Sequence, residues 1–321
     1  MAQFIKKKGK LFRKLKKMRN MKRMSKRKKI AVTKGIIEPK GLKKGISIHI
    51  GMEYIDPEHY NGSDGALRTC GKDCLDMQEL AESQNFESTT VLMNESATRD
   101  AVTKAIADTA EKLEAGDMLF ISYSGHGSSI PDESADEDDG KDESWCLFDG
   151  FLLDDELYAL WTKFKEDVRI IIVSDSCHSG TITKVLPGED VNSVIISKHF
   201  PDEEAKKVYL AHKGFYLKVK ALAVESKDKE VKASVKLIAG CQDIESSYVL
   251  PNDENSLLTR ELNRVWDAGQ FVGTTPEFFE KIKKGVKSIA YDNRIYQEPN
   301  LYDVGKKNEQ FDTQKPFGIY E

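Results

Sequence analysis

Short apolar runs alternate with amphipathic segments from Lys44 to about residue 290. The runs predict strands, because they are brief and rich in Ile and Val, and the first of them alternates apolar with polar positions. The segments between them repeat apolar residues at intervals of three and four, which is typical of helices that pack by one face. Strands are predicted at 45–51, 89–93, 118–123, 169–173 and 235–239, and helices at 73–84, 98–114, 154–164, 256–266 and from 275 onward.

The order of these elements predicts the fold class. Strands that alternate with helices favour an α/β domain with a mostly parallel central sheet and helices on both faces. The run at 169–173 is the most apolar and is predicted at the centre of that sheet. Two insertions interrupt the pattern. One is the segment 131–143, which holds eight carboxylates, and the other is the polar, lysine-rich segment 186–232.

Composition narrows the class of protein. With 39% hydrophobic residues in 321, the chain has enough apolar surface for a large core, which excludes a disordered protein. No apolar run approaches the roughly 18 residues of a membrane span, and the basic–apolar–small order of a secretory signal is not found. Five cysteines, an odd number, favour a reducing compartment over a disulfide framework. We therefore expect a cytoplasmic location.

Charge divides the chain into two parts. Residues 1–29 hold 15 Lys and Arg and no acid, so the rest of the chain is strongly acidic although the whole carries only −4. Leu11, Leu15, Met18 and Met21 recur at helical spacing in this tail. A basic amphipathic helix on an anionic membrane or nucleic acid, a solvated basic arm, and an arm docked on the acidic body are all compatible with this pattern.

Two predicted strands end in reactive residues. The strand 118–123 leads into Ser124, Gly125, His126 and Gly127 (SGHG), and the strand 169–173 leads into SDSCHSG with Cys177. Because ligands bind beyond the carboxyl ends of parallel strands, neighbouring strands would bring this histidine and cysteine together as a nucleophilic dyad. A metal site of Cys177, His178 and His126 is the alternative, although a fourth ligand at zinc spacing is not found nearby.

The two motifs resemble those of the caspase-like cysteine peptidases, and in particular the metacaspases and their bacterial relatives. The segments Cys70–Asp73 (CGKD) and Ile238–Asp243 (IAGCQD) are similar to two further motifs of that group. The resemblance implies a caspase-like three-layer α/β/α fold. It also implies a basic tail and linker at 1–43 and a peptidase domain at 44–321. Within that domain, 44–185 would be large-subunit-like, 186–232 linker-like and 233–321 small-subunit-like.

The resemblance also implies roles for single residues. Cys177 would be the nucleophile, His126 the general acid and base, and the backbone amides of Gly127 and Cys177 the oxyanion hole. Asp73 and Asp175 would line the S1 pocket, with Ser124 and Cys70 beside them. Two carboxylates in one pocket select a cation, so the expected reaction is hydrolysis of peptide bonds after Arg or Lys.

Calcium is a further implication of the resemblance. Asp142, Asp154 and Asp155 fall where the family has three of its calcium ligands, and carboxylates suit such a hard cation. The fourth ligand position is Lys184 in this chain. A lysine there would either supply the charge of the ion or abolish its binding, so we expect no required cofactor. The acidic segment is equally compatible with a solvated flap.

Expectations about partners and self-processing follow from the same resemblance. Protein or peptide substrates with Arg or Lys at P1 are expected, and the family resemblance implies a monomer. The lysines of the insertion make self-cleavage there a hypothesis; they include Lys206, Lys207, Lys213, Lys218 and Lys220. The alternatives are an inactive caspase-like scaffold, and an adaptor that binds nucleic acid or membrane through its basic tail.

Overall fold

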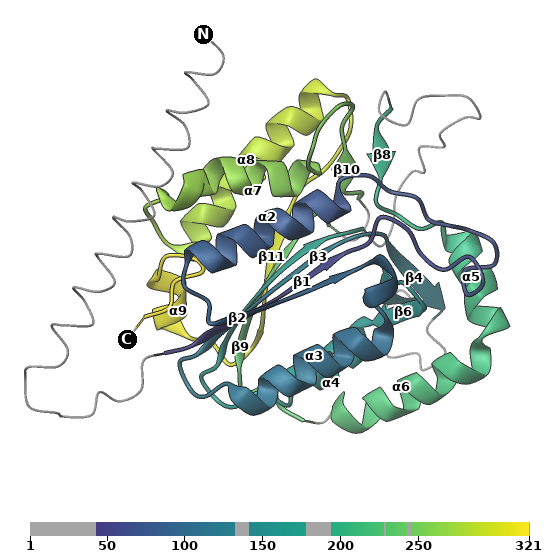
Figure 1. Cartoon of the computed structure of the whole chain (residues 1–321), viewed down its shortest axis with the longest axis horizontal. Helices are drawn as coiled ribbons and strands as arrows, with labels where there is room; N and C mark the ends of the chain where they lie inside the picture. Colours follow the sequence, from purple (N-terminus) through teal and green to yellow (C-terminus); the bar gives the residue numbers. More distant parts are fainter. Residues whose placement is uncertain (1–42, 132–140, 178–193, 228, 243–244, 321) are drawn as a thin grey trace, which may run out of the picture. The chain divides into compact units, whose positions relative to one another are not determined.

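The computed structural model describes residues 43–131, 141–177, 194–227, 229–242 and 245–320 (Figure 1). Contacts divide the chain into Met1–Leu42 and a second unit, Lys43–Glu321, that contains all the described residues. The basic tail, most of the acidic segment, His178 and Lys184 lie outside these residues, so the predictions made for them remain predictions. Among the described residues, no helix is both long and apolar enough to cross a membrane.

A six-stranded sheet forms the centre of the unit, with the strand order β11-β9-β7-β3-β1-β2. All neighbouring pairs are parallel except β11 with β9, which is antiparallel. The strands are β1 (Gly45–Gly51), β2 (Ser88–Met93), β3 (Met118–Ser124), β7 (Arg169–Asp175), β9 (Ser234–Ala239) and β11 (Asn300–Gly305). This arrangement confirms the predicted α/β class with a mostly parallel sheet, and β7 lies inside the sheet as its apolar sequence predicts.

Helices cover both faces of the sheet (Figure 1). In β3, Phe120 points into one apolar cluster, whereas Leu119 and Ile121 point into the other, because successive side chains of a strand alternate between faces. The first cluster includes residues of α2 (Cys70–Ser83), α7 (Leu257–Trp266) and α8 (Thr275–Asp292), and the second includes residues of α3 (Arg99–Lys112) and α4 (Asp154–Trp161).

The helix termini follow from local hydrogen bonding. Thr98 precedes α3, and its side-chain oxygen accepts a hydrogen bond from the Ala101 amide (3.2 Å), as the predicted cap requires. At α8, Thr274 and Glu277 form a capping box, and Pro276 occupies the first turn, where no backbone N–H is needed. The predicted helix at 73–84 begins earlier, at Cys70, so Asp73 lies in its first turn.

The insertion at 186–232 is more structured than a polar linker. It holds β8 (Ile196–Ser197), which pairs with β10 (Tyr248–Val249), and the helices α5 (Asp202–Ala211) and α6 (Lys213–Lys227). Ala205, Val208 and Tyr209 of α5 are buried, and α6 packs on α4. The sequence pattern also misses an antiparallel sheet of β4 (Gly127–Pro131), β5 (Lys141–Leu147) and β6 (Gly150–Leu153), and the short helix α9 (Glu309–Thr313).

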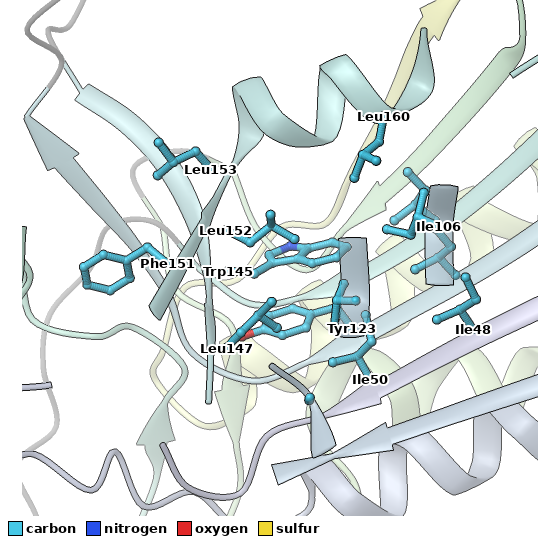
Figure 2. Packing of buried hydrophobic residues seen from close by; sticks show 14 of the residues in the cluster. Ile48, Ile50, Ile106, Tyr123, Trp145, Leu147, Phe151, Leu152, Leu153 and Leu160 are labelled. Atoms are coloured by element: carbon cyan, nitrogen blue, oxygen red, sulfur yellow. The ribbon is translucent and has the colours of Figure 1, made fainter. Parts of the chain in front are cut away.

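An aromatic stack joins the small sheet to the large one. The rings of Tyr123 in β3 and Trp145 in β5 are nearly parallel, with centroids 4.6 Å apart (Figure 2). The Tyr123 hydroxyl donates a hydrogen bond to the His126 carbonyl (2.6 Å), and Trp145 Nε1 donates to Ser174 Oγ (2.9 Å). The stack therefore holds the carboxyl ends of β3 and β7 in a fixed relation to the small sheet.

Candidate active site

The two reactive loops start from neighbouring strands. Ser124 at the end of β3 pairs with Asp175 at the end of β7, so these strands are neighbours, as the expected dyad requires. Gly127 lies against Cys177, because a Cβ at Gly127 would come within 2.4 Å of the Cys177 carbonyl oxygen and 3.1 Å of its nitrogen. Only glycine allows this approach, which brings the two amides predicted for the oxyanion hole to the same place.

Cys177 is fully buried, and its surroundings favour the thiolate. Burial by itself raises the pKa of this thiol, but hydrogen bonds from the Cys241 thiol, the Ser247 backbone and the Ser197 hydroxyl outweigh it and hold the pKa below its ordinary value. The Ser197 hydroxyl lies 3.8 Å from the Cys177 sulfur. A lowered pKa increases the fraction of thiolate, which is the nucleophilic form.

His126 is a partly buried, neutral imidazole. Burial lowers its pKa to about 4, and the nearby His199 and Lys198 add to the lowering. Its Nδ1 has no hydrogen-bond partner among the described residues. A histidine that is neutral at pH 7 is able to accept a proton, as a general base must.

The predicted pocket carboxylates come together from different elements. Asp73 lies in the first turn of α2 and Asp175 at the end of β7, and each is 1% exposed. The Ser124 hydroxyl donates to Asp73 Oδ2 (2.7 Å). The Ser256 hydroxyl lies 2.6 Å from Asp73 Oδ2 and also contacts Asp175 Oδ2. Further donors are the Ser256 amide and Asn255 Nδ2 to Asp73, and the Ser247 hydroxyl to Asp175.

A lysine of the same chain fills the space between these carboxylates. Lys198 Nζ lies 3.2 Å from Asp73 Oδ2 and 3.0 Å from Asp175 Oδ2, and its side chain is completely buried. The same ammonium donates to Ser124 Oγ (2.7 Å). Burial would lower the pKa of Lys198, but the two carboxylates outweigh it and hold the pKa well above its ordinary value. The lysine is therefore a buried cation with two anionic partners.

The backbone of Lys198 is bound as closely as its side chain. The Gly127 amide donates to the Lys198 carbonyl (2.9 Å), and the Lys198 amide donates to the Ser247 carbonyl (2.8 Å). One residue pair further on, the Phe200 amide donates to the Gly127 carbonyl (2.8 Å). Just before Lys198, β8 pairs antiparallel with β10. The segment from Ile196 to Phe200 thus lies as an extended strand across the ends of β3 and β7.

Cys70 packs in an apolar cluster and is not a second nucleophile. It is fully buried and clusters with Leu67, Ile196 and Val249. Burial raises the pKa of its thiol to about 12, so the thiol stays protonated near neutral pH. Its predicted place beside Asp73 is the N-terminal turn of α2.

The residues predicted for calcium do not form a metal site. Asp142 is buried, and its Oδ2 contacts the Lys220 ammonium in an ion pair. Burial raises the pKa of Asp154 to about 8, and the carboxylates of Asp155, Asp142 and Glu143 add to the rise. Among the described residues, no group of three or more His, Cys, Asp or Glu is arranged to hold a metal. A divalent ion does not fit this arrangement, because an ammonium already neutralises Asp142.

Sequence reasoning did not identify several residues of the site: Lys198, Cys241, Ser247, Asn255 and Ser256. Ser256 carried a signal, since it starts the predicted helix at 256–266. In the structure its hydroxyl does not cap α7 and contacts the two pocket carboxylates instead. Lys198 carried none, because it is one lysine among many in the insertion. Lys220, one of the lysines named for the insertion, is buried in the structure.

Comparison with known proteins agrees with this geometry. Residues 43–186 match the family model described as "Metacaspase, peptidase C14 domain". The chain carries a metacaspase-type peptidase domain. Metacaspase-4 of Arabidopsis thaliana is 38% identical over 132 residues, which is 38% of this chain and 32% of that protein. Metacaspase-7 of the same plant is 32% identical over 261 residues, covering 77% of this chain and 58% of that protein.

A solved structure extends the likeness beyond the metacaspase domain. The crystal structure of protein GSU0716 from Geobacter sulfurreducens is 37% identical, with a TM-score of 0.71, and the match covers 87% of this chain and all of that one. By contrast, the match spans about a third of the length of several curated metacaspases. Residues 43–186 thus match a metacaspase peptidase domain, and the solved relative extends the likeness to 87% of the chain.

Proposed function

We propose that this metacaspase-type protein is a cysteine endopeptidase that cleaves after Lys or Arg and that processes itself at the Lys198–His199 bond. The observation that carries the proposal is the position of Lys198. Its ammonium lies between Asp73 and Asp175, while its carbonyl oxygen accepts a hydrogen bond from the Gly127 amide. A substrate lysine at P1 needs both contacts, one for recognition and one for oxyanion stabilisation.

The surrounding residues have the chemistry for the reaction. Cys177 Sγ attacks the Lys198 carbonyl carbon, and His126 accepts the thiol proton. The carbonyl oxygen becomes an oxyanion held by the Gly127 and Cys177 amides, and one such donor is worth about 3 kcal/mol of barrier. His126 then gives its proton to the His199 amine as the C–N bond breaks. Water hydrolyses the thioester, which releases the Lys198 carboxylate and restores the thiol.

Specificity follows from the charge of the pocket. Asp73 and Asp175 are both buried, so a neutral or acidic P1 side chain would leave two carboxylates without a counter-charge. Arginine satisfies the same pair through its planar, bidentate guanidinium. We therefore expect hydrolysis after Arg and Lys, and none after Asp.

Three predictions from sequence remain proposals of their own. They are an anionic surface as the partner of the basic tail, a monomeric state, and a cytoplasmic location. If peptidase activity is not found, the inactive scaffold and the tail-mediated adaptor are the next candidates.

Mass spectrometry of the purified full chain tests self-processing. Wild type should convert with time into two fragments that separate after Lys198, and Cys177→Ala should remain intact. Lys198→Gln should not be cut at this position, whereas Lys206→Gln/Lys207→Gln, which alters exposed lysines of α5, should be cut as wild type is. A cut at another bond in wild type, or a cut in Cys177→Ala, would contradict the proposal.

Matched peptides that end in Arg, Lys or Asp test the activity in trans. Cut wild type should hydrolyse the first two, and Cys177→Ala should hydrolyse none. An enzyme that cleaves peptides but leaves its own chain intact would support the peptidase and exclude self-processing.

A further inference from the structure

Lys220 forms a buried ion pair that lies outside the peptide-binding site. Its Nζ contacts Asp142 Oδ2, and the two side chains are 6% and 2% exposed. The same ammonium donates to the Pro131 carbonyl (2.8 Å) and lies 5.5 Å from the centre of the Tyr209 ring. The lysine comes from α6, while Pro131 and Asp142 belong to the hairpin strands β4 and β5.

The surroundings of this pair are rich in carboxylates. Asp154 and Asp155 begin α4, and both line one pocket with Glu143 of β5. Trp145 and Trp161 line the same pocket. Carboxylate and carbonyl oxygens are the ligand types of a hard divalent cation, but with Lys220 in place the described carboxylates are not arranged as a metal site. The Lys220 ammonium contacts the Asp142 carboxylate and the Pro131 carbonyl. It supplies a positive charge there, as a metal ion would, but needs fewer oxygen ligands.

We propose that Lys220 is a tethered cation that replaces a divalent metal ion at this carboxylate cluster, so that the fold and the site of this chain need no calcium. An ammonium provides three donors and a positive charge, and its covalent link to α6 removes the cost of capturing a free ion. A buried carboxylate such as Asp142 requires a counter-charge of one kind or the other.

The ion pair also lies on the ladder that carries Gly127. Pro131 and Asp142 lie near one end of the β4–β5 ladder, and Gly127, whose amide binds the Lys198 carbonyl, lies at the other. Lys220 thus joins the far end of that ladder to α6. If the proposed cut after Lys198 occurs, Lys220 and Asp142 fall on different fragments, and the pair then helps to hold them together. That last consequence rests on the proposed function, whereas the tethered cation does not.

The test measures cation binding and stability without using activity. All variants are made in the full chain that carries Cys177→Ala, so that self-processing does not enter the result. Terbium replaces calcium in oxygen sites, and Trp145 and Trp161 are close enough to the pocket to excite its luminescence. Lys220→Gln should acquire sensitised terbium emission that calcium competes away. The parent chain should show none. The control Lys236→Gln should show none either; it breaks the ion pairs of another buried lysine with the more exposed Asp303 and Asp312.

Thermal unfolding provides the second readout. In EDTA, Lys220→Gln should melt roughly 5 °C or more below its parent, and calcium should reverse most of the loss. Lys220→Arg should behave as the parent does, and Lys236→Gln should lose stability without any response to calcium. The double variant Asp142→Asn/Lys220→Gln should recover stability in EDTA, because the unpaired carboxylate is gone.

Several outcomes would overturn the proposal. One is a parent chain that binds terbium at this site or melts lower in EDTA than in calcium. Another is a Lys220→Gln chain that folds but gains no cation response. A Lys220→Gln chain that fails to fold both with and without calcium also contradicts it, because the ion should then replace the missing ammonium.

Discussion

Lys198 and Lys220 belong to the same insertion, and both are buried against carboxylates, yet their surroundings differ. Lys198 lies in an extended segment whose amide and carbonyl bond to Ser247 and Gly127. Lys220 lies within α6, where helical hydrogen bonds occupy the backbone. Proteases bind substrates as extended strands, so of these two lysines it is Lys198 that fits the proposed cleavage.

The difference shows that the role open to a buried lysine depends on its backbone conformation as much as on its ion pair. Around Lys198, two carboxylates contact the ammonium, and the Gly127 amide, which lies against Cys177, donates to the carbonyl oxygen. Around Lys220, the groups present are carboxylates, a carbonyl and an aromatic ring, and none of them is a nucleophile. The first arrangement suits a bond to be broken, and the second suits a lasting contact.

The largest expected effect separates the carboxylates of the two lysines. Asp73→Asn should weaken transition-state binding of Lys peptides by about 2–5 kcal/mol, because a buried P1 cation loses one of its two carboxylate partners. The loss should be seen as a lower kcat/KM. Asp142→Asn should leave the preference for Lys over Asp peptides unchanged, but should lower the free energy of unfolding by about 3–5 kcal/mol. Peptide kinetics and urea unfolding of both variants measure this. A change of P1 preference in Asp142→Asn would remove the distinction.

A smaller effect concerns acid stability at the Lys198 site. Burial holds the pKa of His126 at about 4, below the ordinary value of 6.5, so the unfolded chain binds more protons between these two pH values. The contribution of His126 to stability is therefore complete above pH 6.5, and as the pH falls to about 4 it decreases by about 3 kcal/mol. Urea unfolding of uncut Cys177→Ala over this range should show the loss.

A control variant isolates the contribution of this one histidine, because other buried groups also titrate. His126→Asn in the same Cys177→Ala background should show a shallower decline of stability between pH 6.5 and pH 4. Equal slopes in the two chains would show that His126 is not the group responsible.

The smallest effect concerns the pKa of the Cys177 thiol. The Cys241 thiol, which donates to the Ser176 carbonyl (3.5 Å), also helps to lower the pKa of Cys177. Cys241→Ala should therefore raise the pKa of Cys177 and slow its alkylation by iodoacetamide at pH 7, roughly threefold to tenfold. The alkylation rate across pH measures this, with mass mapping to confirm that Cys177 is the residue modified. An unchanged profile would assign the lowered pKa to the Ser197, Ser246 and Ser247 donors.

Much of the fold was predictable because strand and helix periodicities are local properties. The run Arg169–Val173 is too apolar for any position but the interior of the sheet. Thr98 marks the start of α3, because its side chain accepts a hydrogen bond from the amide three residues later. The antiparallel strands β4, β5 and β6 carried no comparable signal. Their pairing depends on partners that a local pattern does not reveal, and an acidic segment interrupts them.

By itself, the amino-acid sequence determined the α/β class, the two motifs that contain His126 and Cys177, and the metacaspase likeness. Only the tertiary structure decided which lysine lies between Asp73 and Asp175 and which one forms an ion pair with Asp142. Both decisions depend on contacts between residues far apart in the chain, such as Lys198 with Asp73 and Lys220 with Asp142. Such contacts arise because a buried charge requires a partner, and the fold determines which partner is within reach.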